Sequence, residues 1–131
     1  MIVVDASAIA NMLVYRDDRG RKARAVMGRD LEWAVPEHWT VEVFSVLRGL
    51  HLGGKITETD GAHAVARLPR LGIEHVPLDP LLPRMWQLRS AISGYDAAYV
   101  VLAELRGLTL VTADVKLART ATNYCRVELT A

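Results

Sequence analysis

GYDAAYVVLAELRGLTLVTADVKLA, residues 94–118, predicts a buried helix followed directly by a buried strand. Residues 97–106 have the length and apolar pattern of a helix that ends at Gly107, and residues 108–112 form a short apolar, β-branched run typical of a strand. Two aspartates, Asp96 and Asp114, stand at the edges of these elements. Helix capping explains an acid at either position, and so does a cation site.

The rest of the chain repeats this alternation of strands and helices. Strands are predicted at 2–5, 31–35, 73–78, 108–112 and 125–129, and helices at 8–14, 17–28, 37–50, 58–68, 80–92, 97–106 and 115–122. Strands separated by helices indicate βαβ units and a parallel sheet. The first and fourth strands are the most continuously apolar, as expected when both faces of a strand are covered. The first strand is therefore expected near the centre, and the simplest strand order is 3-2-1-4-5.

The composition is that of one ordinary globular domain. The chain has 131 residues, 51% hydrophobic and 24% charged, so we expect a single domain spanning 1–131. Its one cysteine, Cys125, excludes an intrachain disulfide and fits a reducing cytoplasm. The sequence shows neither a signal peptide nor an apolar run of about 18 residues, so we expect a cytoplasmic protein without a membrane span.

Two of the acids follow predicted strands. Asp5 ends the first strand and Asp114 comes just after the fourth. Sites in open parallel sheets form at the carboxyl ends of strands, at the point where the strand order reverses. In the order 3-2-1-4-5 the first and fourth strands are neighbours at that point, so Asp5 and Asp114 are expected to lie close together.

Two further acids belong to predicted helices. Glu42 lies three residues after Trp39 and four before Val46, inside the apolar stripe of its helix, where a carboxylate is costly unless it is paired or binds a metal. A buried arginine or the start of its own helix offers Glu42 an alternative partner. Asp96 is well placed as an N-cap, and Ser7 is expected to cap the helix at 8–14. Capping and metal binding are compatible, because a carboxylate has two oxygens.

Four acids that meet in one place need a cation. Two like charges 4 Å apart repel by about 4 kcal/mol at an effective dielectric constant near 20, and a divalent ion reverses that energy. Oxygen ligands without His or Cys suit Mg²⁺ or Mn²⁺. Such ions hold phosphates and activate water, so the predicted chemistry is phosphodiester hydrolysis.

Several weaker features carry two interpretations each. Thr112 is either an ordinary strand residue or a residue that orients a carboxylate, and Arg89 is either a surface arginine or a contact for the scissile phosphate or a carboxylate. The four histidines have no metal-ligand spacing and are interpreted as ordinary residues. An arginine-rich segment, residues 16–29, fits a solvated helix face or a nucleic-acid footprint. Its bases are Arg16, Arg19, Arg21, Lys22, Arg24 and Arg29.

Four motifs in order resemble those of the PIN-domain ribonucleases, and in particular the VapC-type toxins of bacterial toxin–antitoxin pairs. The motifs are IVVDASAIA at the start, PEHWTVEVFSVL in the middle, GYDAAYVVLAE, and LVTADVKLA near the end. The resemblance covers nearly the whole chain and implies a PIN-like three-layer α/β/α fold. It places the family's acidic metal ligands at Asp5, Glu42, Asp96 and Asp114, with Ser7 and Thr112 completing the first and last motifs.

The resemblance also implies an activity and partners. These are Mg²⁺- or Mn²⁺-dependent cleavage of RNA, inhibition by a cognate antitoxin protein, and a homodimer. Some relatives carry a further acid after the last aspartate, where this chain has Val115 and Lys116, which puts a fully occupied second metal site in question. An alternative is a catalytically inactive binding module on the same scaffold, acting through a protein or RNA partner. A receiver domain is disfavoured, because no paired acid beside the first strand and no late lysine at a strand end is evident.

Overall fold

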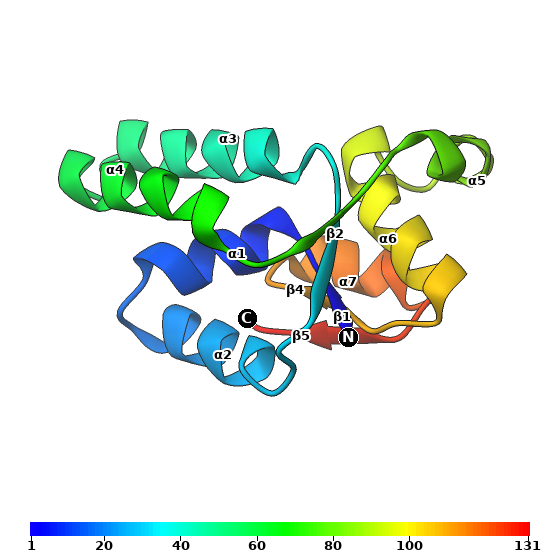
Figure 1. Cartoon of the computed structure of the whole chain (residues 1–131), viewed down its shortest axis with the longest axis horizontal. Coiled ribbons are helices and arrows are strands. Elements are labelled where there is room, and N and C mark those ends of the chain that lie inside the picture. Colours follow the sequence, from blue (N-terminus) through cyan, green and yellow to red (C-terminus); the bar gives the residue numbers. More distant parts are fainter.

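Five short strands form one parallel sheet in the order β3-β2-β1-β4-β5. Figure 1 shows β1, β2, β4 and β5 of this sheet with the helices packed around them. The computed structural model describes residues 1–131. The strands are β1 (Ile2–Val4), β2 (Trp33–Pro36), β3 (Glu74–Val76), β4 (Leu110–Thr112) and β5 (Val127–Leu129). Val3 of β1 is in register with Ala34 of β2 on one side and with Leu110 of β4 on the other. The predicted strand order is confirmed, with every pair parallel.

Helices cover both faces of the central strands. The helices are α1 (Ala6–Val14), α2 (Asp18–Met27), α3 (Trp39–Leu52), α4 (Glu58–Arg67), α5 (Leu82–Gln87), α6 (Gly94–Arg106) and α7 (Val115–Ala121), with 3₁₀ turns η1 (Leu68–Arg70) and η2 (Asp79–Leu81). Neighbouring strand residues point to opposite faces, and Val3 and Val4 are both fully buried. Both faces of β1 are therefore covered, which confirms the three-layer α/β/α arrangement.

Helix α6 lies at the centre of the packing. Seven successive residues, Ala97–Ala103, are buried, so this helix is apolar on all sides over two turns. It contacts β1, β2 and β4. A helix buried all round has to be held by the elements around it, which fixes where its first turn points. No helix in the structure combines the length and the apolar character needed to cross a membrane.

The helix predicted at 80–92 is wrong in its extent. A 3₁₀ turn occupies Asp79–Leu81, α5 ends at Gln87, and the next helix begins only at Gly94. Pro80 and Pro83 lie near the starts of η2 and α5, where their missing N–H groups cost no hydrogen bond. Because Pro83 has no N–H group, it cannot make the helical hydrogen bond to a carbonyl of the preceding turn. The segment is therefore divided into η2 and α5.

Candidate active site

Asp5 lies at the carboxyl end of β1 and begins α1. Its carboxylate is 4% exposed and accepts hydrogen bonds from the backbone N–H of Ala8 at 3.0 Å, the hydroxyl of Ser7 at 2.7 Å and the hydroxyl of Thr112. Asp5 is therefore the N-cap of α1, and the predicted cap at Ser7 is wrong because Ser7 lies inside the helix. Burial raises the pKa of Asp5 to about 6, although the three hydrogen bonds act in the opposite direction.

Thr112 and Ser7 connect the ends of β1 and β4. The Thr112 hydroxyl donates to Asp5 and accepts from the backbone N–H of Asp114 at 3.0 Å. The Ser7 hydroxyl accepts from the N–H of Ala113 at 3.0 Å while it donates to Asp5. Two of these bonds, Thr112 to Asp5 and Ala113 to Ser7, join residues more than 100 positions apart in the chain. Thr112 thus orients the Asp5 carboxylate, which was one of the two interpretations offered for it.

Asp114 follows β4 and begins the last helix. Its side chain is exposed and accepts from the N–H of Leu117 at 3.0 Å, so it is the N-cap of α7. One carboxylate oxygen makes this bond, and no other hydrogen bond or ion pair involves its carboxylate. Capping and ligation therefore remain compatible at Asp114, as the sequence suggested.

Asp96 lies in the first turn of α6 rather than at its cap. Ser93 is the N-cap, and its hydroxyl accepts from the backbone N–H of Asp96. The capping alternative for Asp96 is therefore wrong, because the helix begins three residues earlier than predicted. Its half-buried carboxylate has a raised pKa, first through burial and then through the negative charges of Glu42 and Asp114. That electrostatic influence indicates that acids from α3, α6 and α7 face one region.

Glu42 lies in the first turn of α3 and contacts a histidine that sequence reasoning missed. The Nε2 atom of His38 lies 2.8 Å from Oε1 of Glu42, yet this Oε1 is buried and has no hydrogen-bond partner. The contact is thus close but lacks good hydrogen-bond geometry, and His38 Nε2 also lies 3.3 Å from the carbonyl oxygen of Tyr95. Sequence reasoning could have found this contact, because His38 and Glu42 are four residues apart and residues at that spacing are neighbours on a helix.

Three buried polar atoms near these acids have no hydrogen-bond partner: Nδ1 of His38, Oε1 of Glu42 and the hydroxyl of Tyr99. The rings of His38 and Tyr99 lie 5.4 Å apart. Burial raises the pKa of Tyr99, and so do the charges of Glu42, Asp5 and Asp96. Unpaired buried polar atoms are costly and call for a partner.

The donor chemistry fits a hard divalent cation, but the side chains do not form a closed set of ligands. No group of three or more His, Cys, Asp or Glu side chains is placed to enclose an ion. The orphaned Oε1 of Glu42 and the raised pKa values of Asp5 and Asp96 are features that a bound cation would relieve. Binding would therefore require the side chains of Glu42, Asp96 and Asp114 to rotate toward one ion.

A cavity of about 220 Å³ opens beside two of these acids. Asp96 and Asp114 line it from α6 and α7, together with Lys116, which the sequence analysis considered only as the absence of a further acid after Asp114. Arg89 lies elsewhere: its guanidinium donates to the carbonyl of Trp86 at 2.9 Å and stacks over the Trp86 ring at 4.4 Å. Arg89 makes no bond to any of the four carboxylates, as in the surface interpretation.

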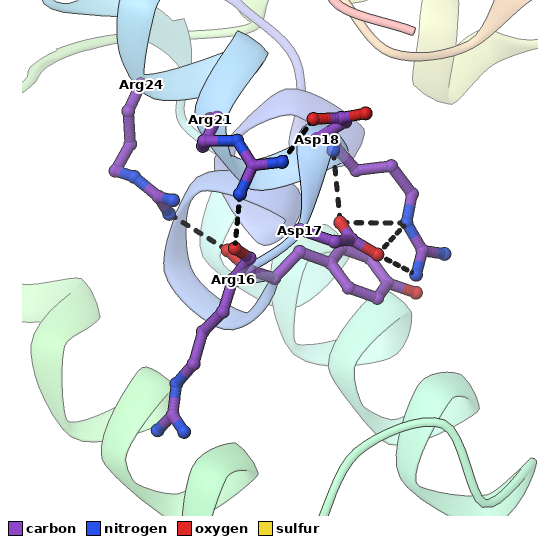
Figure 2. A network of polar contacts seen from close by, with 7 residues as sticks. Arg16, Asp17, Asp18, Arg21 and Arg24 are labelled. Atoms are coloured by element: carbon purple, nitrogen blue, oxygen red, sulfur yellow. Dashed lines mark hydrogen bonds and ion pairs between the residues drawn. The ribbon is translucent and has the colours of Figure 1, made fainter.

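The arginine-rich segment uses most of its charges internally (Figure 2). Arg19 pairs with Asp17 at 2.6 Å, and Arg21 pairs with Asp18. Arg24 donates to backbone carbonyls at the end of α1, at 2.9 and 3.1 Å. A charge that already has a partner offers less to a phosphate, so these contacts favour the solvated helix face over a nucleic-acid footprint.

The family of this chain follows from comparison with known proteins. The PIN domain family model matches residues 2–123. Ribonuclease VapC9 of Mycobacterium tuberculosis is 35% identical over 127 residues, covering 97% of this chain and 96% of the relative. The chain therefore belongs to the PIN domain family.

Solved structures share the same fold. Mycobacterium tuberculosis VapC20, a sarcin-ricin loop cleaving toxin, superposes with a TM-score of 0.71 at 16% identity, covering 91% of this chain and 94% of that one. A toxin–antitoxin complex from Klebsiella pneumoniae gives a TM-score of 0.64 at 15% identity, covering 100% of this chain and 98% of that one. At such identities the likeness establishes the PIN-like architecture alone.

Proposed function

We propose that this chain is a metal-dependent endoribonuclease and the toxin of a toxin–antitoxin pair. The observation that carries the proposal is electrostatic: in addition to burial, the charges of Glu42 and Asp114 raise the pKa of Asp96, and the charge of Asp96 raises the pKa of Asp5. The family and the VapC ribonucleases that resemble the chain over nearly its full length supply the reaction class. VapC9 is named a ribonuclease and VapC20 a sarcin-ricin loop cleaving toxin, which supports RNA as the proposed substrate class.

In this proposal the four carboxylates of Asp5, Glu42, Asp96 and Asp114 hold Mg²⁺ or Mn²⁺. The bound ion would supply charge stabilisation for the phosphate and lower the pKa of a water. Asp5 is held in place by its three hydrogen bonds, so its carboxylate keeps one orientation in the site.

Glu42 would reach the ion through its orphaned Oε1, with His38 behind it as a second contact. Asp114 would use the oxygen that does not cap α7. Asp96, half-buried in the first turn of α6, would complete the set from the cavity that it lines together with Asp114. Each of these roles leaves the backbone in place and asks only for side-chain rotation.

The proposed partners are an antitoxin protein and a second copy of this chain. The Klebsiella structure is a toxin–antitoxin complex, which supports an antitoxin for this fold. Large apolar side chains are exposed on α3, α5 and the first turn of α6, as a self-association surface requires. They are Val41, Phe44, Leu52, Leu82, Trp86 and Tyr95.

The test of the activity is cleavage of RNA by the wild-type chain and by Asp5→Asn, with Mn²⁺ or Mg²⁺ present. Asn keeps the shape and the N-cap oxygen of Asp5 but removes the charge, so we expect cleavage to fall by at least about 100-fold. Asp18→Asn is the matched control, because Asp18 is an exposed acid on α2 that pairs with Arg21. Equal cleavage by wild type and Asp5→Asn would refute the proposal.

A second candidate is a binding module that cleaves nothing. The observation in its favour is that no three candidate ligands are already placed around an ion. Titration calorimetry with Mn²⁺ separates the two, because the nuclease has to bind the ion and lose that binding in Asp5→Asn. No heat of Mn²⁺ binding, together with tight RNA or protein binding, would favour the module.

A further inference from the structure

The cavity between α6 and α7 contains a cation that has no partner. Lys116 lines this cavity of about 220 Å³ with Asp96, Asp114, Ser93 and Thr120. Although two acids line the same space, no carboxylate oxygen lies within 4.0 Å of the Lys116 ammonium, since it takes part in none of the ion pairs of the molecule. Its side chain is exposed, so the ammonium is available to a ligand.

Helix stability does not explain this lysine. Lys116 is the second residue of α7, where the positive end of the helix dipole disfavours a cation by about 0.3–1 kcal/mol. Arg19, Arg21 and Arg106 each pair with a nearby acid, whereas Lys116 shares a cavity with two acids and pairs with neither. An unpaired cation at an unfavourable helix position, inside a cavity shared with two candidate ligands, indicates a role in binding.

The charge of the cavity points to the ligand. Asp96 and Asp114 repel a polyanion, yet the proposed reaction requires a phosphodiester to approach these carboxylates. A lysine ammonium is a compact charge on a flexible stem that donates up to three hydrogen bonds, which suits a phosphate oxygen. Lys116 therefore offsets the repulsion where the strand would enter the cavity.

We propose that Lys116 binds a non-bridging phosphate oxygen of the RNA strand at the α6–α7 cavity. The contact rests on the proposed function for its substrate class, and it gives the strand a defined position beside Asp96 and Asp114. Lys116 is then a substrate-binding residue that does not need the metal ion to act. The competing role is that of an internal counter-ion for the two acids.

The test measures RNA binding without cleavage. A fluorescent single-stranded RNA of mixed sequence is titrated with the full-length chain in EDTA at several NaCl concentrations, using wild type, Lys116→Ala and Lys116→Arg. Removing one phosphate contact reduces the slope of log K against log salt by about 0.7 for a single strand. We expect Lys116→Ala to show that reduction with a several-fold loss of affinity, and Lys116→Arg to restore both.

Lys55→Ala is the matched control, because Lys55 is an exposed lysine in the turn between α3 and α4, outside this cavity. We expect it to leave the salt slope at the wild-type value. An unchanged slope in Lys116→Ala, or an equal change in Lys55→Ala, would overturn the contact. A Lys116→Ala protein with an unchanged RNA slope but an altered Mn²⁺ affinity would identify the counter-ion role instead.

The outcomes also separate this contact from the proposed activity. Wild-type protein that binds RNA through Lys116 but cleaves nothing with Mn²⁺ would overturn the nuclease and leave the contact standing. Wild-type protein that cleaves RNA, with a salt slope that Lys116→Ala does not change, would overturn the contact and leave the nuclease standing.

Discussion

The Asp5 carboxylate caps a helix and is also a proposed metal ligand, although burial makes its negative charge costly. As the N-cap of α1 it accepts a backbone hydrogen bond, and as a proposed metal ligand it has to carry a negative charge while 4% exposed. Two hydroxyl donors, on Ser7 and Thr112, make the charge tolerable by replacing the water that burial removed. The Ser7 and Thr112 hydroxyls also accept hydrogen bonds from the backbone N–H groups of Ala113 and Asp114, just after β4. The position of both donors, and with it the stability of the Asp5 charge, therefore depends on the backbone after β4.

Thr112→Val tests this arrangement at the level of one hydroxyl. Valine has nearly the same shape but removes the donor to Oδ2 of Asp5, which is buried, and the acceptor for the part-buried N–H of Asp114. We expect the free energy of unfolding to fall by about 1–3 kcal/mol. Urea denaturation of the metal-free protein near neutral pH measures the change.

Thr130→Val is the control for that substitution. Thr130 is equally buried, but its hydroxyl makes only one long bond, of 3.4 Å, to the carbonyl of Thr112. We expect a loss of less than about 1 kcal/mol there. Equal losses for the two valine variants would show that the bond to Asp5 is worth no more than an ordinary buried hydroxyl.

At the scale of elements, the sequence predicts which segments are helices better than where they begin. The helix before Gly107 was expected to begin at residue 97 with Asp96 as its cap, because Asp is a common N-cap residue. The structure begins α6 at Gly94 with Ser93 as the cap, which moves Asp96 into the first turn. Both residues are good N-caps, and only the packing of the buried helix decides between them.

The site residues were predictable where the backbone alone places them. Asp5 and Asp114 follow adjacent parallel strands, so the strand order is enough to bring them to one edge. The contact between His38 and Glu42 and the cavity at Lys116 depend on side-chain directions and on the tilt of helices against one another. Periodicity carries no information on either, which is why the contact of His38 with Glu42 and the cavity beside Lys116 were not predicted.

Alanine substitutions of two glycines test the backbone conformation of α6 and α3, the helices that carry Asp96 and Glu42. Gly107 ends α6 with φ of 64°, and nothing lies within 4 Å of a Cβ added there, so Gly107→Ala isolates the cost of the left-handed conformation. We expect a loss of about 1 kcal/mol. Gly49 lies inside α3 with the same open space, and Gly49→Ala is expected to stabilise by about 0.5–1 kcal/mol.

Thermal or urea unfolding of both variants checks the pair. Because neither substitution meets a neighbouring atom, opposite signs are the result that the backbone predicts. A stabilising Gly107→Ala would mean that α6 ends in another conformation in solution. That would in turn question the position of the loop leading to β4.

At the scale of the whole molecule, the sheet brings together charges that the fold alone does not stabilise. Asp5 and Asp96 both have pKa values above the ordinary value for an aspartate, mainly because of burial. The metal-free protein therefore carries an electrostatic cost at neutral pH that is absent when these groups are protonated. A cation that binds only the folded chain removes that cost, so stability, pH and metal binding are coupled.

The pH dependence of unfolding in EDTA makes this coupling measurable. The folded pKa of Asp5, about 6, exceeds the ordinary aspartate pKa of 3.8, so the folded state binds more protons between these values. Its stabilising contribution is complete below about pH 4 and is lost as the pH rises through 6, by about 3 kcal/mol at most. We expect the free energy of unfolding in EDTA to decrease from about pH 4.5 to 7.5, and Asp96 to act in the same direction.

Two controls address the negative charge of Asp5. The Asp5→Asn substitution removes this charge, and added Mn²⁺ is expected to bind it. Asn cannot titrate, so the variant should lose most of the decrease and be more stable than wild type in EDTA at pH 7.5. Mn²⁺ at about 100 times its dissociation constant should stabilise the wild type by about 2.7 kcal/mol at that pH and leave Asp5→Asn nearly unchanged. A wild-type stability that rises between pH 4.5 and 7.5 in EDTA, with no effect of Mn²⁺, would contradict both the buried charge at Asp5 and its proposed role as a ligand.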